Sequence, residues 1–283
     1  MFSVLLGAMI KTVILSFILF YSIAANAQRN NHVYKNLHEA LANPTQVYHL
    51  KLSFNGLDSL SPEIGKLLNL EELELNNNNL KKLPPEIGNL INLKKLNLFR
   101  NKISALPDEI GKLTQLEYLL LSSNQLETLN PSIGHLISLK ELSLKDNKLH
   151  SLPDEIGSLV SLQQLFLSFN YLSRIPGSIG RCVLLEQLYI NNNILSGLPP
   201  EIGLLKKLKF LYIGKNSLQQ IPLEICSLDK LQELDLAYSG NIGLLASCLA
   251  DLPVLDILYI DSYSSTPYSI LTQKNFRLKV IIQ

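Results

Sequence analysis

The sequence predicts a repeat protein of the α/β class, built from similar coils that each add one short strand to a parallel sheet. Leucine recurs every 23 residues over nine copies, and a second apolar residue follows each of these leucines two positions later. Self-similarity at a fixed period of this size is the signature of a solenoid or a related array. The repeating leucines are Leu50, Leu73, Leu96, Leu119, Leu142, Leu165, Leu188, Leu211 and Leu234.

The Leu-x-Leu pair predicts a strand, because side chains along a strand point alternately to opposite faces. The two apolar residues then face the core, and the residue between them faces outward. Strands one period apart stack side by side, so the sheet is parallel. The outward residues, in chain order, are Lys51, Glu74, Asn97, Leu120, Ser143, Phe166, Tyr189, Tyr212, Asp235 and Tyr259.

An asparagine follows the second apolar residue by three positions in eight copies, and Ser239 takes its place in the next copy. An amide side chain carries both donors and acceptors, so it can satisfy backbone groups that a tight turn would otherwise bury unpaired. We therefore predict a structural row of Asn55, Asn78, Asn101, Asn124, Asn147, Asn170, Asn193 and Asn216.

The second half of each copy centres on a Leu-Pro-x-Glu-Ile-Gly segment. Ten of the 13 prolines and seven of the 14 glycines fall in this segment. Proline suits the first turn of a short helix, where its missing N–H would have no partner, and glutamate complements the helix N-terminus. The segment thus predicts a short helix or turn in every copy.

Each copy runs L-x-x-L-x-L-x-x-N-x-L-x-x-L-P-x-E-I-G-x-L-x-x, and in this the chain resembles the leucine-rich repeat family in its 23-residue form. The resemblance covers residues 47–283 and is to exported bacterial members in particular. It implies a curved solenoid with a parallel sheet on the concave face and short helices or turns on the convex face. It also implies a role in protein–protein interaction.

Residues 1–27 predict a secretory signal peptide. Lys11 precedes an uncharged, mainly apolar run over residues 12–23, and Ala25-Asn26-Ala27 provides a small-x-small cleavage site. The run is shorter than the roughly 20 residues that a membrane-spanning helix needs. We expect cleavage after Ala27 and a secreted, periplasmic or cell-surface protein with no membrane span left after cleavage.

The two ends of the array predict caps, because an uncapped stack would expose apolar side chains and unpaired strand edges. Residues 28–46 form the N-terminal helical cap, with a helix over residues 33–42. The repeats occupy residues 47–261, with about ten strands. Residues 262–283 form the C-terminal cap, with a short helix over residues 268–274 and a final edge strand of residues 278–282.

Charge and motifs exclude several classes of function. Without residues 1–27 the chain carries 24 basic and 24 acidic side chains, which gives no general reason to expect nucleic acid as a partner. Phosphate-binding, dinucleotide-binding and zinc motifs are absent. The five histidines occupy unrelated repeat positions. We therefore expect neither an enzyme, nor a cofactor, nor a metal site.

The three cysteines have structural interpretations. Cys182 replaces a core leucine and should be a small buried apolar residue. Cys226 replaces the repeat glycine, and Cys248 lies in the next copy. The sequence leaves open whether these two form a disulfide, although we expect their side chains to face different directions.

The outward strand positions are the candidate binding surface, because Phe166, Tyr189 and Tyr212 follow one another on adjacent strands. Aromatic and polar groups on a rigid platform suit protein or peptide recognition. Alternatively, the rings stack on their neighbours and only stabilise the sheet. The candidate residues are Tyr118, Leu120, Phe166, Glu186, Gln187, Tyr189, Asn191, Phe210, Tyr212, Lys215 and Tyr259.

The favoured function is that of a non-enzymatic, exported module that binds a protein or peptide ligand on its concave face. A carbohydrate or cell-wall ligand is one alternative, because rows of aromatic rings also stack on sugars. An intracellular signalling scaffold is another, if the N-terminus is not cleaved.

Overall fold

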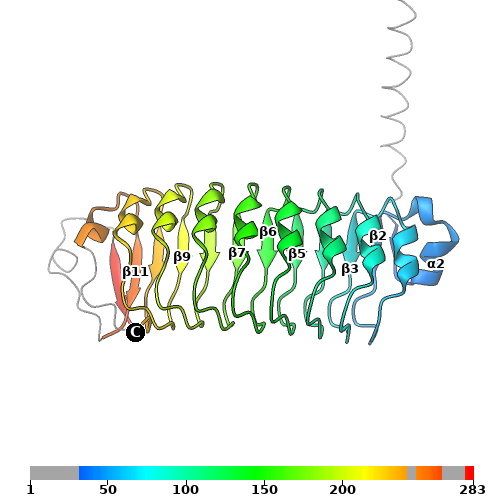
Figure 1. The fold of residues 1–283 in the computed structure, drawn as a ribbon, viewed down its shortest axis with the longest axis horizontal. Coiled ribbons are helices and arrows are strands. Elements are labelled where there is room, and N and C mark those ends of the chain that lie inside the picture. Colours follow the sequence, from blue (N-terminus) through cyan, green and yellow to red (C-terminus); the bar gives the residue numbers. More distant parts are fainter. Residues whose placement is uncertain (1–31, 241–246, 263–277) are drawn as a thin grey trace, which may run out of the picture.

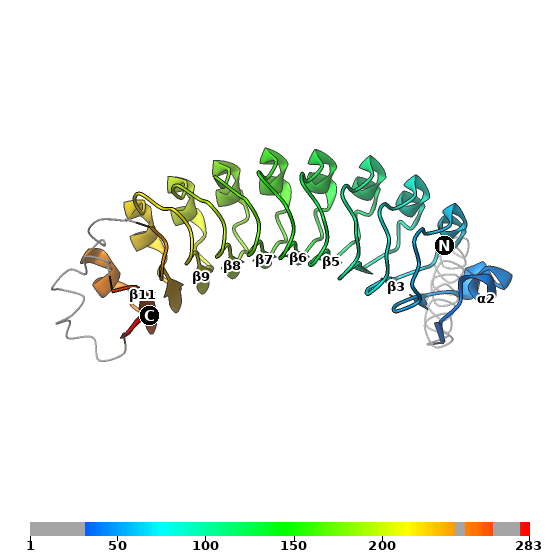
Figure 2. The ribbon, with the colours of Figure 1, turned by 90° about the horizontal axis from the view of Figure 1, so that it is seen from below.

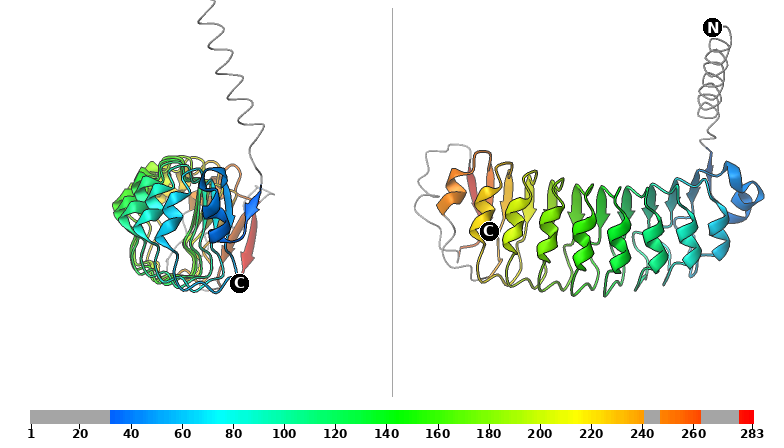
Figure 3. Two further views of the ribbon diagram at one scale, coloured as in Figure 1. Left: turned by 90° about the vertical axis from the view of Figure 1, so that its right-hand side faces the viewer. Right: turned by 45° about the horizontal axis from the view of Figure 1, so that its top comes forward.

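A computed structural model describes residues 32–240, 247–262 and 278–283. The expected signal peptide and the expected helix of residues 268–274 lie outside these residues. The described chain winds into a curved stack of coils, with the strands on the concave side and short helices on the convex side (Figures 1 and 2). The end-on view shows successive coils overlying one another (Figure 3). The predicted α/β solenoid is confirmed.

Within the described residues, 12 strands form one parallel sheet in sequence order. Leu73 lies opposite Leu96 in the register, and the other repeat leucines continue this line with side chains buried in the core. The repeat strands are β2 (His49–Lys51), β3 (Glu72–Glu74), β4 (Lys95–Asn97), β5 (Tyr118–Leu120), β6 (Glu141–Ser143), β7 (Gln164–Phe166), β8 (Gln187–Tyr189), β9 (Phe210–Tyr212), β10 (Glu233–Asp235) and β11 (Ile257–Ile260).

The second half of each coil forms a 3₁₀ helix of five residues on the convex side. In each of the first eight, the backbone N–H that follows the helix donates to the carbonyl of the buried isoleucine within it. These helices are η2 (Pro62–Lys66), η3 (Pro85–Asn89), η4 (Asp108–Lys112), η5 (Pro131–His135), η6 (Asp154–Ser158), η7 (Gly177–Arg181), η8 (Pro200–Leu204), η9 (Leu223–Ser227) and η10 (Ser247–Asp251).

The asparagine side chains bridge neighbouring coils. Asn147 donates from Nδ2 to the carbonyl of Leu144 in its own coil and to that of Leu121 in the preceding coil, each at 3.0 Å. Its Oδ1 accepts the N–H of Leu126 at 3.0 Å. Equivalent bonds recur from Asn78 to Asn216. In the next coil the single hydroxyl proton of Ser239 is donated to the carbonyl of Leu236, at 2.5 Å, and the carbonyl of Ile213 lies 3.5 Å from the same oxygen.

Asn55 differs from the other members of the predicted row. Its side chain is exposed and takes no part in the ladder, while its backbone N–H donates to Oδ1 of Asn78 at 3.1 Å. The reason is its position in the first full coil. In the other coils the amide donates to a carbonyl 26 residues earlier, and for Asn55 that position lies outside the described residues.

The N-terminal cap contains a strand that the sequence analysis missed. The predicted helix from residue 33 is wrong at its start, because Val33–Tyr34 form β1, which pairs with β2. The α-helix α2 spans Leu37–Ala42, and the side chain of Asn36 caps it by accepting the N–H of His38 and Glu39. A short 3₁₀ helix, η1 (Pro44–Gln46), leads into the first repeat.

At the other end the period lengthens by one residue, since Leu234 of β10 lies opposite Leu258 of β11. The last strand, β12 (Lys279–Ile282), pairs with β11 and corresponds to the expected edge strand. Among the described residues, none of the helices is long and apolar enough to cross a membrane.

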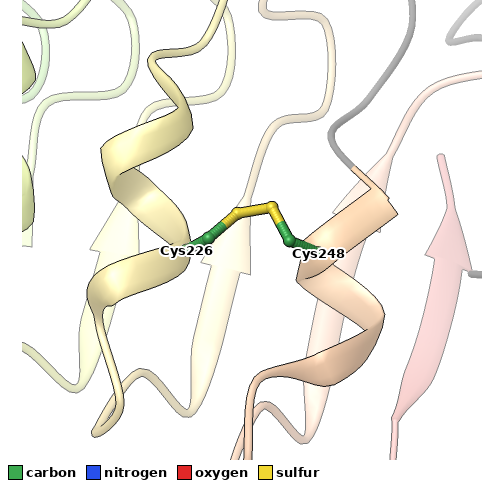
Figure 4. Close-up of a disulfide and its surroundings, with 2 residues drawn as sticks. All are labelled: Cys226 and Cys248. Atoms are coloured by element: carbon green, nitrogen blue, oxygen red, sulfur yellow. A yellow bond between two sulfur atoms is a disulfide. The ribbon is translucent and has the colours of Figure 1, made fainter.

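Cys226 and Cys248 form a disulfide between η9 and η10, with their Cα atoms 5.9 Å apart (Figure 4). The expectation that they face different directions is wrong. The inserted residue places Cys248 at the position that Glu224 holds one coil earlier, and this is the position that faces the repeat glycine. Cys182 is buried as expected, and burial raises the pKa of its thiol to about 11.

The repeat glycine permits the close approach of neighbouring 3₁₀ helices. A Cβ atom added at Gly203 would lie 2.6 Å from the carbonyl oxygen of Glu224 and 2.7 Å from its Cβ atom. A Cβ atom added at Gly197 would meet nothing within 4 Å. The glycine is therefore required by packing at the first position and not at the second.

We predict that Gly203→Ala lowers the free energy of unfolding by about 1–3 kcal/mol, because the neighbouring coil must move away. Gly197→Ala serves as the matched control and should change it by less than about 1 kcal/mol in either direction. Chemical denaturation measures both variants. Equal midpoints for the two would show that the coils can separate at no cost.

Candidate binding face on the concave sheet

The outward residues of the repeat strands form two columns across the concave face. The first column begins at His49 and the second at Lys51, and each gains one residue per strand. In the second column, Phe166 of β7, Tyr189 of β8 and Tyr212 of β9 lie opposite one another in the register. The sequence had placed these residues on adjacent strands, and the pairing brings them together.

The three rings stack on each other across the strands. The ring centroids of Phe166 and Tyr189 are 5.2 Å apart with an angle of 28° between the planes, and those of Tyr189 and Tyr212 are 4.6 Å apart at 9°. Tyr259 of β11 reaches over Asp235 to lie 6.3 Å from Tyr212. We call Phe166, Tyr189, Phe210, Tyr212 and Tyr259 the aromatic patch.

This stacking determines which part of each ring is presented on the concave surface. The spacing of the rings matches the spacing of the strands, about 4.8 Å, so the rings stand on edge across the sheet. The faces of Tyr189 are covered by Phe166 on one side and Tyr212 on the other. The concave surface therefore presents ring edges and hydroxyl groups. The rings do stack on their neighbours, as the alternative interpretation of the sequence expected.

The hydroxyl of Tyr212 donates a hydrogen bond to Oε2 of Glu233 on the next strand. Burial and, after it, this bond raise the pKa of Tyr212. Burial raises the pKa of Tyr189 as well, and the charge of Glu233 adds to this effect. Both phenols are therefore neutral donors at physiological pH, held in place by their surroundings.

Two further carboxylates lie near the patch. Asp235 of β10 accepts the N–H of Ala237 at 2.9 Å through Oδ1. Burial raises the pKa of Asp235 despite this bond, and burial also raises the pKa of Glu141 on β6. Both groups thus lose water around the charged form, which costs free energy.

The N-terminal strands carry a different surface. Lys51 lies 3.3 Å from Glu74, Lys95 lies 4.0 Å from the same carboxylate, and His49 lies 3.6 Å from Glu72. A hollow of about 380 Å³ opens here, lined by Val33, Lys35, His49, Leu50, Lys51, Glu72 and Glu74. This half of the face is polar, and its carboxylates lie within ion-pair distance of lysine or histidine side chains.

Some of the predicted site residues lie apart from the patch. Tyr118 and Leu120 are on β5, and the small Ser143 of β6 separates Leu120 from Phe166 in the register. Glu186 lies before β8 and pairs with Lys209 at 2.7 Å.

The remaining candidates lie beside or beyond the patch. Gln187 lies opposite Phe210 in the first column. Asn191 follows β8 and accepts a hydrogen bond from Ser168 Oγ at 2.5 Å. Lys215 is exposed in the turn after β9, where its backbone takes a φ of 53°. Glu186, Asn191 and Lys215 therefore border the patch at the ends of the strands.

An exposed aliphatic row that was not predicted from the sequence lies between the 3₁₀ helices and the strands. Its members are between 51% and 56% exposed. The row consists of Leu68, Ile91, Ile137, Val160 and Val183. These residues recur with the 23-residue period, so the sequence could have predicted the row. Each of them directly follows a core residue such as Leu67, however, and the pair looks like one apolar stretch of the core. Thr114 holds the same position in one coil.

Comparison with known proteins agrees with this architecture. A family model described as a leucine-rich repeat region matches residues 85–170, and one for a single leucine-rich repeat matches residues 69–90 and 161–182. A solved leucine-rich repeat protein of Leptospira interrogans is 35% identical, with 89% of this chain and 81% of that chain covered and a TM-score of 0.56. The chain belongs to the leucine-rich repeat family.

Other solved structures match over part of their length, and one of them is a leucine-rich repeat ectodomain. The ectodomain of the membrane receptor kinase GASSHO1/SCHENGEN3 from Arabidopsis thaliana, solved in complex with Casparian strip integrity factor 2, is 30% identical with a TM-score of 0.75. That match covers 84% of this chain and 30% of the ectodomain. The plant peptide hormone receptor RGFR1, in complex with RGF2, is 26% identical with a TM-score of 0.62, covering 89% and 46%. Curated proteins give no significant match.

We predict that the ring stack contributes to the stability of this leucine-rich repeat array. A double-mutant cycle of Tyr189→Ala and Tyr212→Ala should give a coupling energy of about 0.5–1.5 kcal/mol. Tyr189→Ala combined with Tyr118→Ala, three strands away, should give coupling near zero. Denaturation of the single and double variants measures both values. Absence of coupling in the first pair would mean that the rings do not stack in solution.

Proposed function

We propose that this leucine-rich repeat protein is an exported, non-enzymatic module that binds a protein or peptide ligand over the aromatic patch. The observation that carries the proposal is the patch itself: tyrosine and phenylalanine side chains held in fixed positions on the hollow side of a continuous sheet. Tyrosine combines a large apolar contact area with a polar group, and few of its torsions must be fixed on binding. Such residues dominate protein recognition surfaces.

Related proteins support a protein or peptide ligand. The Arabidopsis ectodomain and the plant hormone receptor described above were both solved with peptide or protein ligands bound. The present chain matches only part of either protein, so the likeness supports the class of ligand and not its identity. The fold also supports a non-enzymatic role, because an open sheet does not enclose the water-excluding pocket that catalysis favours.

The ring geometry disfavours a carbohydrate ligand. A sugar stacks on the flat face of an aromatic ring, but both faces of Tyr189 lie against other rings. Ring edges and phenol hydroxyls suit the mixed apolar and polar surface of a peptide better. A glycan ligand therefore stays the weaker alternative.

Two independent features support export. Residues 1–27 have the three-part pattern of a secretory signal. Cys226 and Cys248 are joined, and structural disulfides form and persist in oxidising compartments outside the cytosol. Both features weigh against an intracellular scaffold. The identity of 35% with the Leptospira protein supports a bacterial source.

The binding proposal predicts that Tyr189→Ala/Tyr212→Ala weakens ligand binding at least tenfold. A displayed library of random peptides, selected on the purified protein, supplies ligands whose affinity is then measured by calorimetry. The matched control is Val160→Thr/Val183→Thr in the aliphatic row, which should leave affinity unchanged. Threonine is chosen because Thr114 already holds this position in another coil.

Two outcomes would contradict this assignment of the site. Loss of binding in the control alone would move the site to the aliphatic row. Full binding by the tyrosine variant would make the ring stack purely structural. Binding on a glycan array, without any peptide ligand, would favour the carbohydrate alternative.

The export proposal predicts a mature protein that begins at Gln28 and holds a Cys226–Cys248 crosslink. Mass spectrometry of the protein from its native cells, without reduction, detects both in one digest. An intact Met1 terminus with two free thiols would contradict export.

A further inference from the structure

The aromatic half of the concave face carries negative charge without cations in contact with it. The outward positions of β5 to β10, two on each strand, include three carboxylates and neither lysine nor arginine. Glu141 lies on β6, at one side of the stacked rings, and Glu233 and Asp235 lie on β10, at the other. The stacked rings of β7, β8 and β9 occupy the space between them.

The carboxylates in the N-terminal half of the same face do have basic side chains close to them. Both Glu72 and Glu74 have a histidine or lysine within 4.0 Å. Within the described residues, no ion pair reaches any of the three carboxylates of the aromatic half. Glu233 accepts the Tyr212 hydroxyl, and Asp235 accepts a backbone N–H.

This arrangement is unfavourable in the free protein. Partial burial removes water from Glu141 and Asp235, and burial is the largest cause of their raised pKa values. The charges of Lys95 and Lys215 lower these two pKa values, but by less than burial raises them. A carboxylate that loses water without gaining a cation in contact costs free energy, and a cation supplied from outside offsets that cost. The aromatic half therefore gains more from a cationic ligand than the N-terminal half does.

We propose that the ligand of the aromatic patch is a protein segment with arginine or lysine side chains at both ends of an apolar stretch. One basic side chain pairs with Glu141, the other pairs with Glu233 and Asp235, and the apolar stretch lies over the rings. The inference rests on the proposed function and adds the chemistry of the partner to it.

The spacing of the strands sets the length of this segment. β6 and β10 are four strand intervals apart, which is about 19 Å at 4.8 Å per interval. An extended chain advances about 3.3 Å per residue, so the two basic residues lie about five or six positions apart. The segment crosses the strands, in the direction of the ring stack.

The orientation of the rings also determines where the cations go. A cation binds the negative face of an aromatic ring, whereas the ring edge is positive. Because the inner faces of the stack are covered and edges point outward, the rings attract the apolar stretch, and the carboxylates at both ends attract the charges.

The test is a selection of random peptides of 12 residues displayed on phage. Enriched sequences should carry two basic residues about five or six positions apart, with apolar residues between them. For a synthetic peptide of this type, Glu141→Gln should weaken binding at least fivefold and reduce its dependence on salt. Glu72→Gln in the N-terminal half is the matched control and should leave the affinity unchanged. The melting temperature of each variant verifies folding.

A charge swap provides the second measurement. Glu141→Lys should abolish binding of the same peptide, and replacing the facing basic residue of the peptide by glutamate should restore it. Enriched peptides without basic residues, or full binding by Glu141→Gln while Tyr189→Ala/Tyr212→Ala loses binding, would overturn the cationic partner and leave the proposed function standing. A selection that enriches no peptide would overturn both.

Discussion

Each coil depends on its neighbours for the hydrogen bonds of its own backbone. The N–H of Leu98 donates to the carbonyl of Leu120 one coil later, at 2.8 Å, and the amide of Asn147 joins carbonyls of two coils. A lone coil would lack these partners and expose both sides of its leucine core, so stability belongs to the array. The same dependence makes the concave sheet continuous, and a continuous sheet can hold side chains from different coils in one fixed arrangement.

Much of the fold follows from the period of the sequence. The leucine spacing predicts which residues face the core, because burial along a strand alternates with every residue. The structure of the two ends of the array is harder to predict from the sequence. Val33 and Tyr34 precede a helical pattern, but the open edge of β2 recruits them as a strand. The orientation of Cys248 depends on a one-residue insertion, whose effect on facing is set by the packing of η9 against η10 and not by local preference.

The candidate site follows from the sequence only in part. The alignment of Phe166, Tyr189 and Tyr212 follows from the repeat, but the angle of each ring depends on the two rings beside it. Whether a carboxylate of the concave face has an ion-pair partner is harder still to predict. Glu74 on β3 and Glu141 on β6 are both outward acids of repeat strands, yet of these two only Glu74 has a lysine within ion-pair distance. That difference arises from the side chains on adjacent strands, which vary from coil to coil.

The covalent link between η9 and η10 makes the two ends of the stack differ in how readily they unfold. A linear array loses structure from its ends, since a terminal coil has a neighbour on one side only. Near the C-terminal end, Cys226 and Cys248 tie two successive coils together, so neither can detach alone. At the N-terminal end of the described residues, β1 and α2 hold the first coil by packing and hydrogen bonds, without a covalent link. Fraying therefore proceeds more readily from the N-terminal side, and the strands that carry the aromatic patch lie nearer the fastened end.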